Sequence, residues 1–431
     1  MKLNSILRTP IALLALLAIL TAMPLPGQAP TEIAVDIDRS RAASLLRISV
    51  PFPALAPGID PAMIQRALFS PLTRDLAFSE IFAIVPLPPN SPANLDSAKK
   101  AQAQAFLQMD VTTEGEDFVI EVRLFDVNSQ RIDLGKRYRG RASALTRIAH
   151  TIANDLVRHY NGTPGIFLTR IAFVSTRDGN KEIYLMDFDG SNQRRVTSHG
   201  TISLNPDWSP DAEQLVYTSF SRNSSDLYVI NRRGGGRQRL STGLGLNTAT
   251  KFSPDGRDIA FVGSVRGNPD IYVMRADGSN IRRLTSATSI ESTPAWSPTG
   301  RQIAFTSGRT GTPQIYVMDA EGTNVRRLSF DGNWNDDAAF SPNGDEIAYT
   351  SRVDGRFQIR VSNLTTGATR VLAGIGSNEQ PTWSPDGRSL VFTSNRTGKW
   401  QLYRVAADGS NPVQLTTVGE NTAPSWSKVI E

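Results

Sequence analysis

The stretch TPAWSPTGRQIAFTSGRTGTPQIYVMDAEGTNVRRLSF, residues 293–330, decides the fold, because close copies of it fill the last two-thirds of the chain. Each copy runs from an aromatic residue through a Ser-Pro turn to an apolar strand, and then to a strand such as Ile-Tyr-Val. The apolar anchors of the copies stand at Ile171, Leu215, Ile259, Ile303, Ile347 and Leu390. Successive anchors lie 44 residues apart, except for a last step of 43. A period of about 40–45 residues with several short strands per unit indicates a β-propeller.

Within this unit the pattern predicts four antiparallel strands, which together make one blade. The predicted strands cover residues 293–296, 302–307, 314–319 and 324–328. The first turn, Ser-Pro-Thr-Gly at 297–300, is favoured because proline presets φ and glycine accepts a positive φ. Arg326 and Arg327 keep the outermost strand charged, which discourages pairing with another sheet edge.

The two ends of the repeat array predict that the ring closes. The first copy starts at Ile171 with no Trp-Ser-Pro strand before it, whereas residues 423–427 form a Trp-Ser strand with no second strand after it. We therefore expect the C-terminal strand to complete the first blade, which leaves no open edge. The aromatic residues before each turn are expected to pack between blades; they are Trp208, Phe252, Trp296, Phe340, Trp383 and Trp426.

The predicted fold class is an α/β N-terminal domain followed by an all-β six-bladed β-propeller closed by the C-terminal strand. The α/β domain is expected over residues 30–160, a hinge over 161–165 and the propeller over 166–431. In the first domain the patterns predict strands at 45–51, 81–85, 105–113, 118–128 and 131–139, and helices at 61–79 and 98–104. A closing helix is expected to start at a Ser143 cap and to run past Leu156.

The first 29 residues have the pattern of a signal peptide, so the chain is expected to be exported. Lys2 and Arg8 give a positive start, and the apolar run from Ile11 to Leu20 is shorter than the roughly 20 residues that span a bilayer. An uncleaved membrane anchor is the alternative interpretation. No later stretch predicts a transmembrane span in the mature chain.

Composition excludes several classes of function. The chain has no cysteine, which excludes thiol chemistry and cysteine-based zinc sites. Its formal net charge of +5 is spread along the sequence without a Lys/Arg block, so nucleic acid is not expected as a partner.

Sequence motifs for catalysis, cofactors or metals are lacking. The three histidines, His150, His159 and His199, have no ligand spacing, and no Gly-x-Ser-x-Gly elbow, His-Glu-x-x-His helix or glycine-rich phosphate loop occurs. The Asp-Gly turns, such as 187–190, are interpreted as hairpin turns rather than calcium loops, because no bidentate Glu follows at the required spacing. We therefore expect no catalytic residue, no cofactor and no metal. An enzyme site assembled from several propeller loops stays an alternative.

An arginine recurs after the second strand of five repeats, at Arg177, Arg222, Arg266, Arg309 and Arg396. Because it is repetitive, we interpret it as a bond to loop carbonyls or acids within each blade. Contact with a partner is the alternative.

The loops before the inner strands are the candidate recognition surface, because they diverge while the repeats around them stay constant. These segments are 203–205, 246–248, 290–292, 333–337, 377–379 and 420–421. Topology puts all six around one mouth of the channel. Trp334 has the character of an interface anchor. The alternative is that Asn and Asp in these loops simply make turns.

An exported chain with a small α/β domain and six such blades resembles the TolB family, the periplasmic component of the Tol-Pal system. The stretch IAFVSTRDGNKEIYLMDFDG at 171–190 is strongly similar to the start of that family's propeller. The resemblance implies a non-enzymatic periplasmic adaptor, monomeric when free. It implies that the propeller binds Pal, the peptidoglycan-associated lipoprotein, and that the N-terminus binds inner-membrane Tol proteins. The family's system supports outer-membrane integrity and invagination during cell division.

Carried over by position, the resemblance implies a Pal-binding face at the propeller mouth. Its members are Asn205, Leu246, Asn247, Ala249, Glu291, Ser292, Trp334, Asp336, Asn378, Glu379 and Asn421. A histidine can stand in that family where this chain has Leu246, so the contact chemistry at that blade stays open.

The resemblance also implies an N-terminal binding segment, and the sequence leaves a rival function open. The segment would comprise Glu32, Ile33, Val35, Asp36 and Ile37. The apolar alternation of this segment suits addition to a sheet edge and equally suits a first strand of the small domain. The alternative functions are a propeller-type hydrolase and a periplasmic peptide- or sugar-binding protein.

Overall fold

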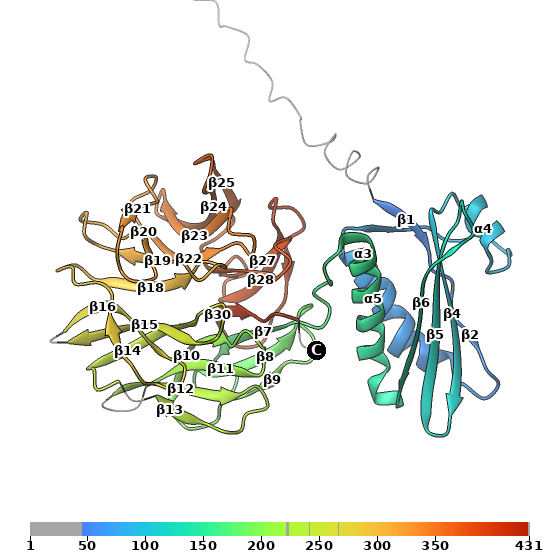
Figure 1. Ribbon diagram of the computed structural model, residues 1–431, viewed down its shortest axis with the longest axis horizontal. Helices are drawn as coiled ribbons and strands as arrows, with labels where there is room; N and C mark the ends of the chain where they lie inside the picture. Colours follow the sequence, from blue (N-terminus) through green and yellow to red (C-terminus); the bar gives the residue numbers. More distant parts are fainter. Residues whose placement is uncertain (1–44, 221–223, 241, 266, 430–431) are drawn as a thin grey trace, which may run out of the picture. The chain divides into compact units, whose positions relative to one another are not determined.

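The structure, a computed structural model, describes residues 45–220, 224–240, 242–265 and 267–429. The predicted signal peptide at 1–29 and the predicted binding segment Glu32–Ile37 lie outside the described residues. Residues 46–431 form one compact unit. An α/β region is followed in this unit by a six-bladed β-propeller, which confirms the predicted fold class (Figure 1). None of the described helices is long and apolar enough to cross a bilayer.

Six four-stranded sheets form the propeller, and five of them keep their strands in chain order. Blade 2 contains β10 (Ile202–Trp208), β11 (Gln214–Phe220), β12 (Ser225–Asn231) and β13 (Gln238–Leu240). Blade 3 contains β14 (Leu246–Phe252), β15 (Asp258–Val265), β16 (Asn268–Arg275) and β17 (Arg282–Arg283). Blade 4 contains β18 (Glu291–Trp296), β19 (Gln302–Ser307), β20 (Gln314–Asp319) and β21 (Arg326–Arg327). Blade 5 contains β22 (Asn335–Phe340), β23 (Glu346–Val353), β24 (Arg356–Asn363) and β25 (Thr369–Ala373). Blade 6 contains β26 (Asn378–Trp383), β27 (Ser389–Ser394), β28 (Gln401–Ala406) and β29 (Val413–Gln414).

The remaining blade closes the ring as the sequence predicts. Blade 1 contains β30 (Asn421–Trp426), β7 (Arg170–Ser175), β8 (Glu182–Asp187) and β9 (Arg194–Arg195), in that spatial order. The C-terminal strand therefore supplies the inner strand of the first blade, with Trp426 opposite Ile171. This pairing joins the two ends of the repeat array and removes a free sheet edge.

The aromatic residues before the turns tie neighbouring blades together, as predicted. The Trp208 indole Nε1–H donates to the backbone oxygen of Ser425 in blade 1 at 3.1 Å. The Trp296 indole makes the same bond to Lys251 of blade 3 at 3.2 Å. A buried indole thus packs as a large apolar group while its N–H finds a partner.

The outermost strand of blade 4 is shorter than predicted, because β21 contains Arg326 and Arg327 alone. Asn324 has a left-handed φ of 53° and its side chain donates to the Asp319 carboxylate, so it belongs to the turn. Asn accepts this conformation more readily than most residues, which is why the turn extends through it.

The α/β region is built on a sheet of order β3-β1-β4-β5-β6, with β2 also paired to β4. The strands are β1 (Leu46–Ser49), β2 (Ala54–Leu55), β3 (Phe82–Ile84), β4 (Ala105–Glu114), β5 (Asp117–Asp126) and β6 (Ile132–Gly140). The helices are α2 (Pro61–Ile64), the π-helical η1 (Gln65–Phe69), α3 (Ser70–Phe78), α4 (Leu95–Lys100), the 3-10 turn η2 (Ala142–Ala144) and α5 (Leu145–Asn161). Apolar residues of α3 and α5 share one core with the sheet, for example Leu72, Leu107 and Ile152.

Two helix boundaries differ from the prediction. The helix expected at 98–104 is α4, which starts earlier because the Asn94 side chain accepts the Ser97 N–H at 3.0 Å and caps it. Ser143 does not cap the closing helix, because it lies inside η2 and α5 follows directly. Gly162 ends α5 in the left-handed conformation. The division of the chain into two domains at 161–165 stays a prediction.

Candidate partner-binding face

The inner strand of every blade starts at the same end of the ring, because all six blades repeat one strand order. The loops leading into these strands gather there, and we call this end the mouth. The mouth loops are residues 198–201, 242–245, 286–290, 330–334, 374–377 and 417–420. The turns after the inner strands lie at the opposite end of the channel.

Exposed apolar side chains surround the mouth. They range from 39% exposed at Trp334 to 73% at Ile375. The set, which we call the apolar ring, is Ile202, Ile290, Phe330, Trp334, Ile375 and Val418. Five blades contribute to it, and half-buried Leu246 stands at the corresponding place in the sixth, blade 3. Apolar side chains gathered on one exposed face mark an interaction surface.

The sequence identified only Trp334 among the apolar ring. The others stand one to five residues before the first polar residue of an inner strand, a recurring position that the repeats reveal once they are aligned. Single exposed apolar residues are common on any protein, so the signal lies in their recurrence at one end of the ring.

Four of the predicted contact residues lie beneath the face. Asn247, Glu291, Asn378 and Asn421 are buried. The Glu291 carboxylate accepts the hydroxyls of Ser289 and Ser307, at 2.9 and 2.7 Å. These side chains therefore hold the mouth loops in place, and any effect on a partner would act through the loops.

The repeated arginine fastens these buried side chains, which bears out its interpretation as a bond within the blade. Arg309 donates its Nη2 to Glu291 at 2.9 Å and its Nε to Ser307 at 2.8 Å. Its guanidinium also stacks on Tyr316 at 4.8 Å. Arg177 and Arg396 make the same contacts to Asn421 and Asn378. Arg222 and Arg266 lie outside the described residues.

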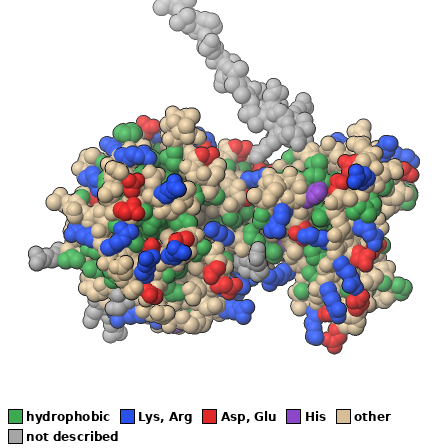
Figure 2. Space-filling view, viewed as in Figure 1, with side chains coloured by type: hydrophobic (Ala, Val, Ile, Leu, Met, Phe, Trp, Pro, Cys, Tyr) green, Lys and Arg blue, Asp and Glu red, His purple; other side chains and the backbone are tan. Residues whose placement is uncertain are grey.

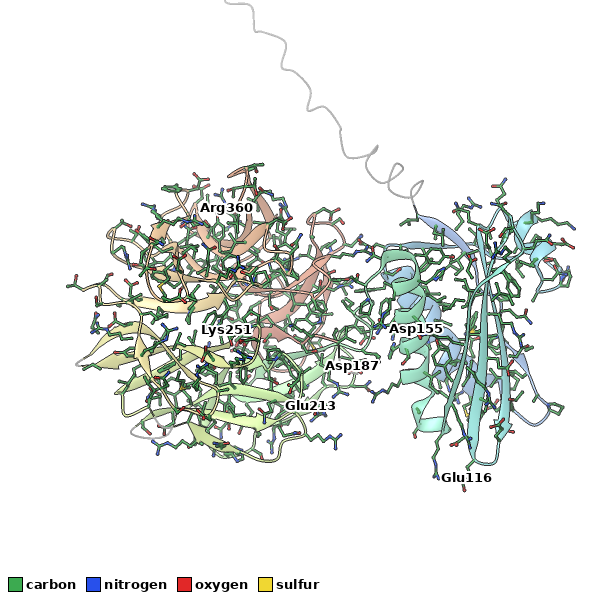
Figure 3. All side chains as sticks on the ribbon, in the orientation of Figure 1. Glu116, Asp155, Asp187, Glu213, Lys251 and Arg360 are labelled. Carbon is green, nitrogen blue, oxygen red and sulfur yellow. The ribbon has the colours of Figure 1, made fainter. Side chains whose placement is uncertain are left out.

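Blade 5 departs from this arrangement. Val353 stands where the other repeats have the arginine, and Arg360 replaces the tyrosine of the third strand (labelled in Figure 3). Asn335 Oδ1 and Ser351 Oγ are consequently buried without a hydrogen-bond partner among the described residues. The loop above them carries Phe330 and Trp334. Asn335 still holds this loop through its Nδ2, which donates to the backbone oxygen of Asp331 at 2.7 Å, but the arginine contact of the other blades is missing.

A β-bulge interrupts each inner strand at the waist of the channel. One residue of every bulge has a left-handed φ near 50°: Asn205, Ala249, Thr293, Asp337, Gln380 and Ala423. This conformation costs about 1 kcal/mol for a residue with a Cβ, so six copies indicate a strong constraint from the ring. Asn205 and Ala249, both predicted as contacts, line the channel wall rather than its rim.

Two cavities meet at this waist. The larger, of about 970 Å³, opens toward the turn end and is lined by prolines and aromatic residues of the inner strands. The smaller, of about 410 Å³, opens toward the mouth. Asn205, Gln380 and Ala423 line both cavities.

The channel wall is acidic where it narrows. Burial raises the pKa of the Asp337 carboxyl well above its ordinary value, and the neighbouring Asp336 and Glu379 add to the rise. Burial also raises the pKa of Glu379, with Asp336 as the second cause. On the turn side, Lys251 pairs with Asp207 at 3.0 Å (Lys251 is labelled in Figure 3).

The remaining predicted residues lie partly at the mouth and partly on the channel wall. Ser292 is half-buried at the start of β18, and Leu246 is half-buried at the start of β14. The Asp336 carboxylate accepts the hydroxyls of Thr293 and Thr306, at 2.7 and 2.6 Å. Outside the mouth, the face shown in Figure 2 intersperses basic and acidic side chains, without a field of one sign.

Known proteins resemble this arrangement in sequence and in structure. A family model described as the TolB beta propeller domain matches residues 157–430. The Tol-Pal system protein TolB of Geobacter sulfurreducens is 38% identical over 211 residues, covering 46% of this chain and 48% of that protein. The same-named protein of Desulfosudis oleivorans is 44% identical over 112 residues, covering 26% of each chain. The matched part of the chain thus spans about half the length of the Geobacter protein.

A solved structure covers more of the molecule. The crystal structure of TolB from Acinetobacter baumannii aligns with 89% of this chain and 96% of its own, at 28% identity and a TM-score of 0.76. The match includes the α/β region as well as the blades, because the propeller alone makes up less of the chain. On the matched propeller and this shared architecture, the chain belongs to the TolB family.

Proposed function

We propose that this chain is a non-enzymatic periplasmic adaptor of a Tol-Pal system. Its propeller mouth binds Pal, and its N-terminal segment around Glu32–Ile37 binds an inner-membrane Tol protein. Through these two contacts it supports outer-membrane integrity and invagination during division. The proposal is supported by relatives named as Tol-Pal system proteins.

The apolar ring is the observation that carries the proposal. Six large apolar side chains are exposed around one opening, and such a group of exposed apolar residues indicates a face that a partner covers. The loops that bear them are fixed from below by buried Asn, Glu and Arg side chains. A pre-organised apolar surface suits a folded protein partner, because little conformational entropy is lost on docking.

The residues that line the channel cavities do not support an enzymatic function as the apolar ring supports partner binding. None of the three histidines lines either of the two cavities. A hydrolase would need a nucleophile and a general base within hydrogen-bond reach of each other at the substrate. We therefore place the function in the rim rather than in the channel wall.

Calorimetry on two forms of the chain tests both contacts. Residues 30–431 should bind the soluble domain of Pal one to one. A chain that starts at residue 38 should bind Pal equally well, yet lose binding to the periplasmic domain of the inner-membrane Tol protein. A correctly folded propeller that ignores Pal would refute the first contact. A shortened chain that still binds the Tol domain would refute the second.

A further inference from the structure

The smaller cavity at the mouth combines an aromatic wall with charges that have no partner. Its volume of about 410 Å³ lies between blades 1, 2 and 6. Lys181, Glu379, Trp400 and Glu420 line it together with smaller residues. Val418 of the apolar ring lies two residues from Glu420, and Ile375 lies four from Glu379. A partner docked on the apolar ring would therefore lie next to this cavity.

The three charged side chains are unpaired. Among the residues that the structure describes, the side chains of Lys181, Glu379 and Glu420 make no hydrogen bond and no ion pair. Elsewhere in the propeller, carboxylates in similar surroundings are satisfied: Asp207 by Lys251 and Glu291 by Arg309, at 3.0 and 2.9 Å. The cavity holds two carboxylates against one ammonium, so it lacks one positive charge.

Of the three charged side chains, Glu379 is in the environment least favourable to its charge. It is half-buried, and the neighbouring Asp336 together with burial raises its pKa. Asp336 cannot relieve it, because it is itself an acid whose Oδ1 is occupied by two threonine hydroxyls. A partly buried carboxylate is costly without a partner, and a cation that enters the cavity removes that cost.

The volume of the cavity and the residues that line it indicate which kind of cation it would bind. Ligand cavities start at about 300 Å³, so this one suits a single long side chain rather than a folded element. The indole of Trp400 offers an aromatic face of the kind that attracts ammonium and guanidinium groups. The apolar stem of a lysine or arginine would also pack against Val174 and Leu204, which line the same cavity.

We propose that this cavity binds a lysine or arginine side chain of the protein that docks on the apolar ring, with its charge between Glu379 and Glu420 and its stem against Trp400. The inference rests on the proposed function, because it assumes a protein partner at the mouth. It specifies one contact of that interface, in which a basic residue of the partner inserts next to the channel entrance.

The test is calorimetry with the soluble domain of Pal on Glu379→Gln, in the full mature chain. The substitution keeps the shape of the side chain and breaks no bond within the propeller, so folding should be retained. We expect affinity about tenfold weaker, and a weaker dependence of affinity on salt, because one ion pair is lost. Glu321→Gln is the matched control, since Glu321 is an exposed acid in the β20–β21 turn, at the end of the propeller opposite the mouth and outside the cavity.

The outcomes separate this inference from the proposed function. If the wild-type chain binds Pal and Glu379→Gln binds it equally tightly, the basic anchor is refuted while the adaptor function stands. If the wild-type chain itself does not bind Pal, the proposed function fails first. If magnesium or calcium chloride alone binds in a Glu379-dependent way and Pal affinity is unaffected by the substitution, the cavity is an ion site and the inference is overturned.

Discussion

Glu291→Ala should lower the free energy of unfolding by about 3 kcal/mol, the lower end of the cost of breaking a buried ion pair. Glu291 is fully buried, and its loss leaves Nη2 of Arg309 and two serine hydroxyls without their acceptor. The lower end applies because Arg309 is 28% exposed and water can reach it in part. Urea denaturation followed by tryptophan fluorescence measures the change.

The repeats supply the control for this prediction. Blades 1 and 6 hold Asn421 and Asn378 at the position of Glu291, and both accept the corresponding arginine, at 3.3 and 3.1 Å. Glu291→Asn should therefore cost much less than Glu291→Ala, on the order of 1 kcal/mol, a typical single hydrogen bond. Equal losses for the two variants would mean that the arginine contact does not stabilise the loop.

Trp334→Ala should weaken binding of the soluble domain of Pal roughly 30-fold, which corresponds to about 2 kcal/mol for a hot-spot aromatic. Trp334 is 39% exposed in the free chain and stands on the most aromatic mouth loop. Its backbone oxygen accepts the Arg352 N–H at 2.8 Å, so removing the indole leaves the path of the loop intact. Calorimetry gives the affinities.

Val413→Ala provides the comparison for Trp334→Ala. Val413 is an exposed apolar residue of similar accessibility, but it lies on β29, the outer strand of blade 6, away from the mouth. Its truncation should leave Pal affinity unchanged. If both variants bind like the wild-type chain, the apolar ring is not the docking surface.

The propeller architecture could be predicted because each repeat contains the residues that specify its own strands and turns. Turn residues, apolar alternation and the 44-residue spacing recur six times, so an error in one repeat is corrected by the others. The α/β region lacks this redundancy. There a single side chain decides a boundary, as Asn94 does for α4, and Ser143 offered an equally plausible cap that the chain does not use.

The predicted segments lie at one end of the ring, but not all of them are loops, because 203–205 and 246–248 lie inside β10 and β14. The orientation of their side chains could not be predicted. Asn and Glu before an inner strand can face a partner or fasten a loop, and sequence type alone does not separate the two. The deciding contact is with an arginine, as between Asn378 and Arg396. In four repeats the arginine, a serine two residues before it and a buried Asn or Glu at the start of the inner strand occur together, which was the available signal.

Hydrogen–deuterium exchange with and without the soluble domain of Pal tests most directly whether the propeller mouth is the docking face. Bound Pal should slow amide exchange in the mouth loops, above all at 330–334 and 374–377, and leave the turns at the opposite end, such as 253–257, unchanged. Protection confined to those turns or to the α/β region, with the mouth loops unaffected, would contradict binding at the mouth.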